Sequence, residues 1–299
     1  MNRPAGKIGV CTDSNSQIPQ ELIDRFDVEV VPITVVVDDH EYLEGVDLDA
    51  DGFYALFTDE HTPTVSTSQP SPGQFALAYD ALIERGCTQI LSIHIASSMS
   101  GTMNSARLAA RSLGVPVRLV DSGTASFGIS CCVWAAGDAL AAGATLDEAA
   151  AVAERLAPSI GNVFVAGALG LIRSSGRGGA LDITDGRDSG CGSGSIPVLA
   201  LIAGRVEVLE RVDTVVDAVN CMSAIAVRWD ERLNVAVGLA DLETAPIAHA
   251  LAHAVGEAAS VNEVITYRIG PSVGAHTGPG TAGCFMFASS LARSIPATS

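Results

Sequence analysis

Short apolar runs alternate with amphipathic stretches along the first half of the chain. The apolar runs are rich in β-branched residues and predict strands, at residues 7–12, 28–37, 88–95 and 116–122. The stretches between and after them repeat apolar residues every three or four positions and predict helices, at residues 71–86, 103–114 and 128–143. Strands separated by helices of this length form βαβ units, so this half predicts a mainly parallel sheet flanked by helices.

Two predicted helices carry start signals. Ser71 precedes Pro72 and Gln74, which is the arrangement of an N-cap, a first-turn proline and a capping box. Thr145 and Glu148 have the same capping-box spacing at the start of a further helix. Both helices are therefore expected to begin directly after the capping residue.

The second half mixes strand and helix signals in a different order. Residues 196–212 predict a β-hairpin that turns at Ala203 and Gly204. Further strands are expected at 162–169, 233–240 and 263–270, and helices at 215–229 and 245–259. A glycine-rich loop at 271–283 then leads into a final helix. We expect a two-domain α/β fold, residues 1–160 and 161–299, with a last helix that can pack on either domain.

Composition narrows the function classes. The chain of 299 residues is 48% hydrophobic and has a formal net charge of −17. Nucleic acids and anionic membrane surfaces require clustered cations, so we expect neither as a partner. No apolar run reaches the ~18 residues of a membrane-spanning helix, and the first residues lack a signal-peptide pattern. Seven cysteines without a CxxC pair predict buried free thiols, no metal site and a cytoplasmic protein.

Four polar clusters follow predicted strands or precede helices. They are residues 12–16, 66–71, 96–102 and 121–124. Ligands of parallel α/β sheets bind at the carboxyl ends of the strands. Ser, Thr and Asp are also the usual N-cap residues, so one such cluster needs no ligand. Together the clusters hold more hydroxyls than capping requires, since residues 97, 98, 100 and 102 alone supply four.

A fifth feature is the segment GAHTGPG, residues 274–280. Its glycines allow close approach of the backbone. The helix expected after it would offer free amides to an anion. His276 adds a donor that can carry charge near neutral pH. The alternative is a simple turn with an exposed histidine.

Hydroxyls, one histidine and helix N-termini suit a single carboxylate. A polyphosphate would require a lysine or several arginines. The sequence contains no Walker A, GxGxxG, HExxH or GxSxG motif. A catalytic triad is defined by geometry rather than by spacing, so a serine-dependent reaction stays open at this point.

The motifs TDS, TSQPSP, SSMSGT, VDS and GAHTGPG occur together in this order. In this they resemble the DegV family, the fatty-acid-binding subunits of bacterial fatty acid kinase, from about residue 8 to residue 290. The resemblance implies two α/β domains with a long-chain fatty acid in a tunnel between them. It also implies a non-catalytic protein without a cofactor, which presents the fatty acid to a separate ATP-dependent kinase subunit of dihydroxyacetone-kinase type for acyl-phosphate formation.

The resemblance further implies which residues hold the fatty acid carboxylate. The matched positions are, in motif order, Thr67, Ser68, Ser97, Ser98 and His276. Thr67, Ser98 and His276 are the first candidates, followed by Ser68 and Ser97. No catalytic residue and no metal ligand is implied.

The sequence departs from the family pattern at two basic sites. The usual lysine-containing turn is here LIRSSGRGG, which keeps Arg173 and Arg177. Asp213 stands where an arginine is usual. Those basic residues are expected at the rim that faces the kinase. The Gly- and Ser-rich loop 186–195 is a further peculiarity of this sequence.

Two other function classes compete with lipid binding. Ser98 and His276 can be read as the nucleophile and base of a serine-dependent acyl-ester hydrolase. A regulatory protein that senses a small metabolite is the third class, and the negative charge argues against its direct contact with DNA.

Overall fold

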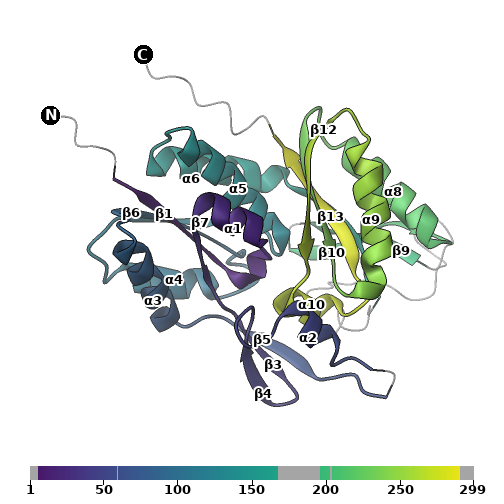
Figure 1. The fold of residues 1–299 in the computed structure, drawn as a ribbon, viewed down its shortest axis with the longest axis horizontal. Helices are drawn as coiled ribbons and strands as arrows, with labels where there is room; N and C mark the ends of the chain where they lie inside the picture. Colours follow the sequence, from purple (N-terminus) through teal and green to yellow (C-terminus); the bar gives the residue numbers. More distant parts are fainter. Residues whose placement is uncertain (1–5, 59, 168–195, 203, 290–299) are drawn as a thin grey trace. The chain divides into compact units, whose positions relative to one another are not determined.

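The computed structural model describes residues 6–58, 60–167, 196–202 and 204–289. The chain divides into two compact units, whose elements are labelled in Figure 1. Among the described residues, the first unit holds 6–34, 67–159 and residue 289, and the second holds the described parts of 35–66 and 160–288. The segment 35–66 thus interrupts the first unit in sequence but belongs to the second.

A parallel sheet forms the centre of the first unit. Its strands are, in spatial order, β2 (Val28–Val31), β1 (Ile8–Asp13), β6 (Gln89–His94) and β7 (Val117–Asp121). All neighbouring strands in this sheet pair in parallel. The predicted mainly parallel sheet is therefore confirmed.

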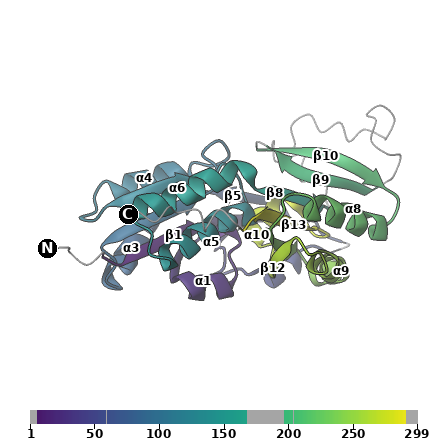
Figure 2. The same cartoon turned by 90° about the horizontal axis from the view of Figure 1, so that it is seen from above.

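Helices cover both faces of this sheet (Figures 1 and 2). α3 (Pro72–Glu84) and α4 (Thr102–Ala110) pack together on one face, where Phe75, Tyr79 and Leu82 are buried. The other face carries α1 (Gln20–Phe26), α5 (Phe127–Ala141) and α6 (Leu146–Leu156). The capping boxes predicted at the starts of α3 and α6 are both present.

A six-stranded mixed sheet forms the centre of the second unit. Its strands are, in spatial order, β10 (Arg205–Val212), β9 (Ile196–Ile202), β8 (Gly161–Val165), β13 (Ala282–Ala288), β11 (Leu233–Leu239) and β12 (Val261–Arg268). β9 and β10 form the predicted antiparallel hairpin. Gly204 in its turn has a φ of 79°, which favours glycine.

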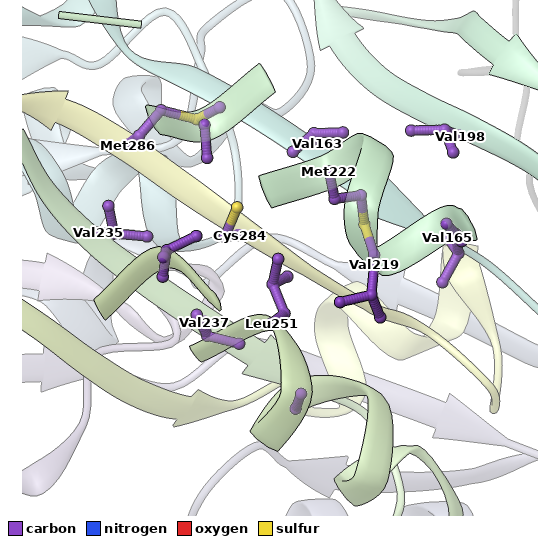
Figure 3. Packing of buried hydrophobic residues seen from close by; sticks show 14 of the residues in the cluster. Val163, Val165, Val198, Val219, Met222, Val235, Val237, Leu251, Cys284 and Met286 are labelled. Atoms are coloured by element: carbon purple, nitrogen blue, oxygen red, sulfur yellow. The ribbon is translucent and has the colours of Figure 1, made fainter. Parts of the chain in front are cut away.

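Two helices cover one face of the six-stranded sheet. They are α8 (Val215–Val227) and α9 (Ala245–Gly256). Figure 3 shows Met222 of α8 and Leu251 of α9 against Val163, Val237 and Cys284 of the sheet. Because the side chains of a strand alternate between faces, these residues form one apolar layer between helices and sheet.

The predicted strand 28–37 is two strands. Pro32 lies between β2 and β3 (Thr34–Val37), which belong to different sheets. Proline has no N–H to donate to a ladder, so it ends the first strand. β3 pairs with β4 (His40–Leu43) and β5 (Val65–Ser68) in a three-stranded sheet. The short helices α2 (Ala50–Tyr54) and α10 (Pro271–Thr277) complete the second unit.

The helix expected after the glycine-rich loop is wrong for the described residues. Residues 282–288 form β13, which lies between β8 and β11 and pairs antiparallel with both. The first six residues of this strand are buried. Backbone pairing on both sides and burial outweigh the local helix signal, since strand preference depends strongly on context. The candidate last helix therefore becomes a central strand of the second unit.

The cysteines of the described residues are free thiols. Cys221 is half-buried, and Cys11, Cys87, Cys131, Cys132 and Cys284 are buried. Burial raises the pKa of Cys132 to about 12 and that of Cys284 to about 12, so both stay protonated at neutral pH. Among the helices in the described ranges, none is long and apolar enough to cross a membrane.

Gly283 distinguishes the observed strand β13 from the loop expected at this position. A Cβ atom at this position would overlap the carbonyl oxygen of Val163, so Gly283→Ala is expected to destabilise the protein by about 1–3 kcal/mol. In a loop, where the backbone can accept an alanine without strain, the same change would stabilise the protein by about 0.4–1 kcal/mol. Urea unfolding of the variant and the wild type measures whether the free energy of unfolding falls or rises.

Gly256→Ala in α9 is the matched control for this substitution. The nearest atom to an added Cβ there is 3.9 Å away, so stability should stay equal or rise by up to about 1 kcal/mol. A Gly283→Ala variant as stable as this control would contradict the strand.

Candidate functional site

Three of the four polar clusters lie at one edge of the parallel sheet. Asp13, His94 and Asp121 are the last residues of β1, β6 and β7. His94 pairs with Asp121 across neighbouring strands, and Thr12 pairs with Ile93. The predicted convergence of the clusters after β1, β6 and β7 at the carboxyl edge is therefore present.

Three side chains of the cluster after β1, those of Asp13, Ser14 and Asn15, make hydrogen bonds within the protein. Asp13 accepts a hydrogen bond from the backbone N of Asn15 at 3.1 Å and caps a short 3-10 turn. Ser14 Oγ accepts from the backbone N of Ile33 at 2.9 Å. Asn15 Oδ1 accepts from the backbone N of Ser126 at 3.0 Å. These groups hold loops together, as the structural reading of such clusters predicts.

The cluster after β6 contains two kinds of hydroxyl, those that bond at the start of α4 and those that make no hydrogen bond to a described residue. Ser100 Oγ lies 2.8 Å from Thr102 Oγ1 and accepts from the Thr102 backbone N at 3.3 Å, at the start of α4. Ser97 and Ser98 are exposed. The Ser97 backbone N donates to the Asp121 carboxylate at 3.2 Å. In the part of the chain that the structure describes, neither the Ser97 nor the Ser98 hydroxyl makes a hydrogen bond.

Thr67 and Ser68 end β5, directly before the segment that leads into α3. Thr67 is half-buried, and Ser68 is exposed. The hydroxyl of Ser68 makes no hydrogen bond to any described residue. It therefore remains available to a ligand.

Gln69 brings the two hydroxyl motifs together in the first unit. Its side chain lies against Gly101, so closely that a Cβ atom on Gly101 would overlap Gln69 Oε1. Gln69 Nε2 also donates to Ser105 Oγ of α4 at 3.3 Å. The glycine of SSMSGT thus admits the glutamine of TSQPSP, which places the loop after Ser68 beside the start of α4.

His276 belongs to the second unit, in the last turn of α10, and is half-buried. The buried Glu44 holds the start of α10, since its Oε1 accepts from the backbone N of Ser272 at 2.8 Å. Gly274 packs on the rings of Tyr54 and Phe53, and a Cβ on Gly274 would lie 2.6 Å from Tyr54 Oη. These contacts set the position of the histidine-bearing helix within its unit.

The anion site expected from a helix after the GAHTGPG loop is wrong. α10 precedes the glycine turn, and β13 follows it. The backbone N of Gly278 donates to the Gly274 carbonyl at 2.7 Å, and the backbone N of Gly280 donates to Asp241 Oδ2 at 2.6 Å. Both amides are therefore used inside the second unit. His276 is the group of this motif that stays a candidate.

Sequence reasoning missed a buried polar chain in the first unit. Tyr79 Oη lies 2.9 Å from Ser92 Oγ, and Ser92 Oγ lies 2.6 Å from His94 Nε2. His94 Nδ1 lies 2.9 Å from Asp13 Oδ2. Burial raises the pKa of Tyr79 far above its usual value, so its hydroxyl stays protonated. Polar residues at positions 92 and 94, two apart in an apolar strand, were the available signal.

This chain has the connectivity of an Asp–His–Ser triad, but its serine cannot meet a substrate. The side chains of Asp13, Ser92 and His94 are 0% exposed. Ser92 Oγ already has Tyr79 Oη as a second partner. A nucleophile must reach the substrate carbonyl, so the geometry does not make Ser92 one.

The positions at which the sequence departs from the family pattern fall partly within the described residues. Arg173, Arg177 and the loop 186–195 lie outside the described residues. Asp213 is exposed and directly precedes Thr214, the N-cap of α8. Within the described ranges, no group of three or more His, Cys, Asp and Glu side chains could hold a metal ion.

The fold and the edge of the parallel sheet define an α/β protein that exposes unpaired hydroxyls beside a helix start. The chain belongs to the DegV family, since the family described as "Uncharacterised protein, DegV family" matches residues 7–289. A DegV domain-containing protein of Streptomyces coelicolor is 32% identical over 277 residues, 92% of this chain and 96% of that protein. The resemblance seen in the sequence is therefore confirmed.

Solved structures of similar proteins share the fold. A DegV family protein from Thermus thermophilus, described as binding fatty acid, has a TM-score of 0.81 and 29% identity, covering 94% of this chain and 99% of that chain. A stearic-acid-binding protein from Eubacterium ventriosum has a TM-score of 0.81 at 20% identity, covering 96% of this chain and 100% of that chain. The second likeness supports the fold alone. The predicted α/β class is confirmed.

Removing the Glu44 carboxylate tests how α10 is held. Glu44→Ala leaves the buried backbone N–H of Ser272 without this acceptor, which is expected to cost about 1–3 kcal/mol. The Ser272 amide should then exchange its hydrogen faster, measured by hydrogen–deuterium exchange of the unliganded protein. Glu44→Gln keeps an oxygen acceptor and is the matched control. Equal exchange in the two variants would contradict the anchoring role.

Proposed function

We propose that this protein binds a long-chain fatty acid in an apolar tunnel. Thr67, Ser98 and His276 hold the carboxylate first, and Ser68 and Ser97 assist. The carrying observation is that the exposed hydroxyls of Ser68 and Ser98, in two neighbouring motifs, have no hydrogen-bond partner among the described residues. The fatty acid binding described for the Thermus relative, at 29% identity over nearly the whole chain, supports the ligand class.

Neutral hydroxyls suit a carboxylate at the mouth of an apolar tunnel. A buried carboxylate without partners would be costly, and each charge-assisted hydrogen bond contributes about 1.5–3 kcal/mol. The acyl chain contributes about 0.8 kcal/mol for each buried methylene. The tail therefore dominates the affinity, and the hydroxyls orient the ligand.

The surroundings of the serine pair support the order of the candidates. The Asp121 carboxylate accepts from the Ser97 backbone N. A second carboxylate close to Ser97 would meet like charge. No described residue bonds to Ser98, which makes Ser98 the better donor to a fatty acid.

The protein's own role is non-catalytic in this proposal. It works in the cytoplasm and presents the acid to a separate ATP-dependent kinase subunit of dihydroxyacetone-kinase type, which forms the acyl phosphate. The burial of Ser92 and His94 supports this view, because the triad-like group cannot reach an ester. A fluorophosphonate probe checks the hydrolase alternative, and covalent labelling of Ser98 would overturn the non-catalytic role.

Native mass spectrometry of freshly purified protein is the direct test. We expect an added mass equal to one fatty acid, released by denaturing extraction. Apoprotein should rebind palmitate and should bind hexadecanol far more weakly, because the alcohol lacks the charge that strengthens the hydroxyl contacts. A protein that carries no acyl chain and refuses added palmitate would contradict fatty acid binding.

Ser98→Ala tests the carboxylate site itself. Loss of one charge-assisted bond of about 1.5–3 kcal/mol predicts roughly 10- to 100-fold weaker palmitate binding. Ser112→Ala is the matched control, since Ser112 is an exposed serine of the same unit outside the motifs. Titration with palmitate measures both, and equal affinities would remove Ser98 from the site.

A further inference from the structure

We propose that the buried chain Tyr79–Ser92–His94–Asp13 is an alignment relay, which holds the two hydroxyl motifs at the spacing that one carboxylate needs. Its members are positioning residues and touch no ligand. The inference rests on the proposed function for its effect on affinity. The contacts of the relay lie entirely in the first unit.

The available protons and acceptors fix which group donates in each hydrogen bond of the relay. Each Asp13 oxygen accepts a backbone N–H, Oδ1 from Asn15 at 3.1 Å and Oδ2 from Ile95 at 3.2 Å. A carboxylate that serves as acceptor on both oxygens receives the proton of His94 Nδ1 as well. Nε2 of the neutral ring then accepts from Ser92.

The far end of the relay agrees with this direction. The Ser92 hydroxyl donates its single proton to His94 Nε2, so its oxygen accepts a hydrogen bond from Tyr79 Oη. If the ring were protonated on Nε2, Ser92 would donate to Tyr79, and the buried phenol proton would lose the Ser92 oxygen as its acceptor. The neutral Nδ1–H form satisfies every member, and buried polar chains are stabilising only when every member is satisfied.

The relay reaches the serine motif through Asp13. Ile95 is the first residue after β6, and its N–H donates to the carboxylate that also holds His94. This bond fixes the direction in which the chain leaves the strand. Ser97 and Ser98 follow two and three residues later.

The relay reaches the other motif through α3. Tyr79 lies on this helix, whose first turn follows Thr67 and Ser68. Phe75, in the first turn, packs edge-on against the His94 ring with centroids 5.0 Å apart and planes at 86°. α3 thus contacts the imidazole directly through Phe75 and reaches it through the bond of Tyr79 to Ser92, while β1 holds it through Asp13. Apolar side chains of similar size would fill the space without fixing these directions.

The first experiment measures the protonation of the His94 ring and the hydrogen exchange of the two motifs in the unliganded protein. Nitrogen-15 NMR of the wild-type protein should show the His94 ring neutral, with its proton on Nδ1 and Nε2 accepting. Hydrogen–deuterium exchange should show faster exchange at Ile95 and in 67–71 in Ser92→Ala than in wild type. A proton on Nε2, or unchanged exchange in both segments, would overturn the relay.

A matched buried serine separates alignment from stability. Ser130→Ala also removes a fully buried hydroxyl of the first unit, which donates to the Ser16 carbonyl at 2.8 Å outside the relay. Both variants should lose a comparable amount in urea unfolding. Ser92→Ala alone should weaken palmitate binding roughly 3- to 30-fold, the range found for positions that act on a site without touching the ligand.

Tyr79→Phe keeps the aromatic ring and is the second variant for the binding test if Ser92→Ala folds poorly. It removes only the first donor and should weaken palmitate binding less than Ser92→Ala, with non-additive effects in the double variant because the two residues share one chain of bonds. Wild-type protein that binds no palmitate would refute the proposed function. Wild-type binding with equal affinities for Ser92→Ala and Ser130→Ala would refute the relay alone.

Discussion

The shared carboxyl edge of β1, β6 and β7 is the constraint on which the rest of the first unit depends. Parallel pairing brings the ends of these three strands to one edge of the sheet. A loop follows each strand, and the backbone N–H groups of these loops need hydrogen-bond acceptors. The Asp13 carboxylate meets two such amides and one imidazole. Asp121 meets two more, at Ser97 and Gly123. Two acidic side chains thus shape the loops on which a hydroxyl site can stand.

Periodicity in the sequence was enough to predict most of the elements, because the apolar positions that define a strand or a helix are also those the fold buries. The capped starts of α3 and α6 were local signals and needed no tertiary context. β13 was missed for the opposite reason. Its residues AGCFMFA become a strand because β8 and β11 lie on either side, and neither neighbour is visible in the local sequence.

The sequence predicts a site built from hydroxyls, but it does not predict which of the hydroxyls are left without a hydrogen bond. Ser14, Ser98 and Ser100 are the same residue in similar polar clusters, yet of these three only Ser98 has a hydroxyl without a hydrogen bond to a described residue. That difference depends on which backbone N–H or hydroxyl lies nearby, so no spacing rule separates capping serines from free ones. His94 was hidden because a polar residue in a buried strand looks like part of the core until its partners are known.

The buried thiols have a consequence for how the chain opens in solution. Thiols react as thiolates, and burial raises the pKa of the Cys11 and Cys284 side chains. A thiol reagent therefore reaches them only during the brief openings that expose the core. Since Cys11 and Cys284 lie in different units, the separate rates at which they are alkylated report how often each unit opens, without any engineered label.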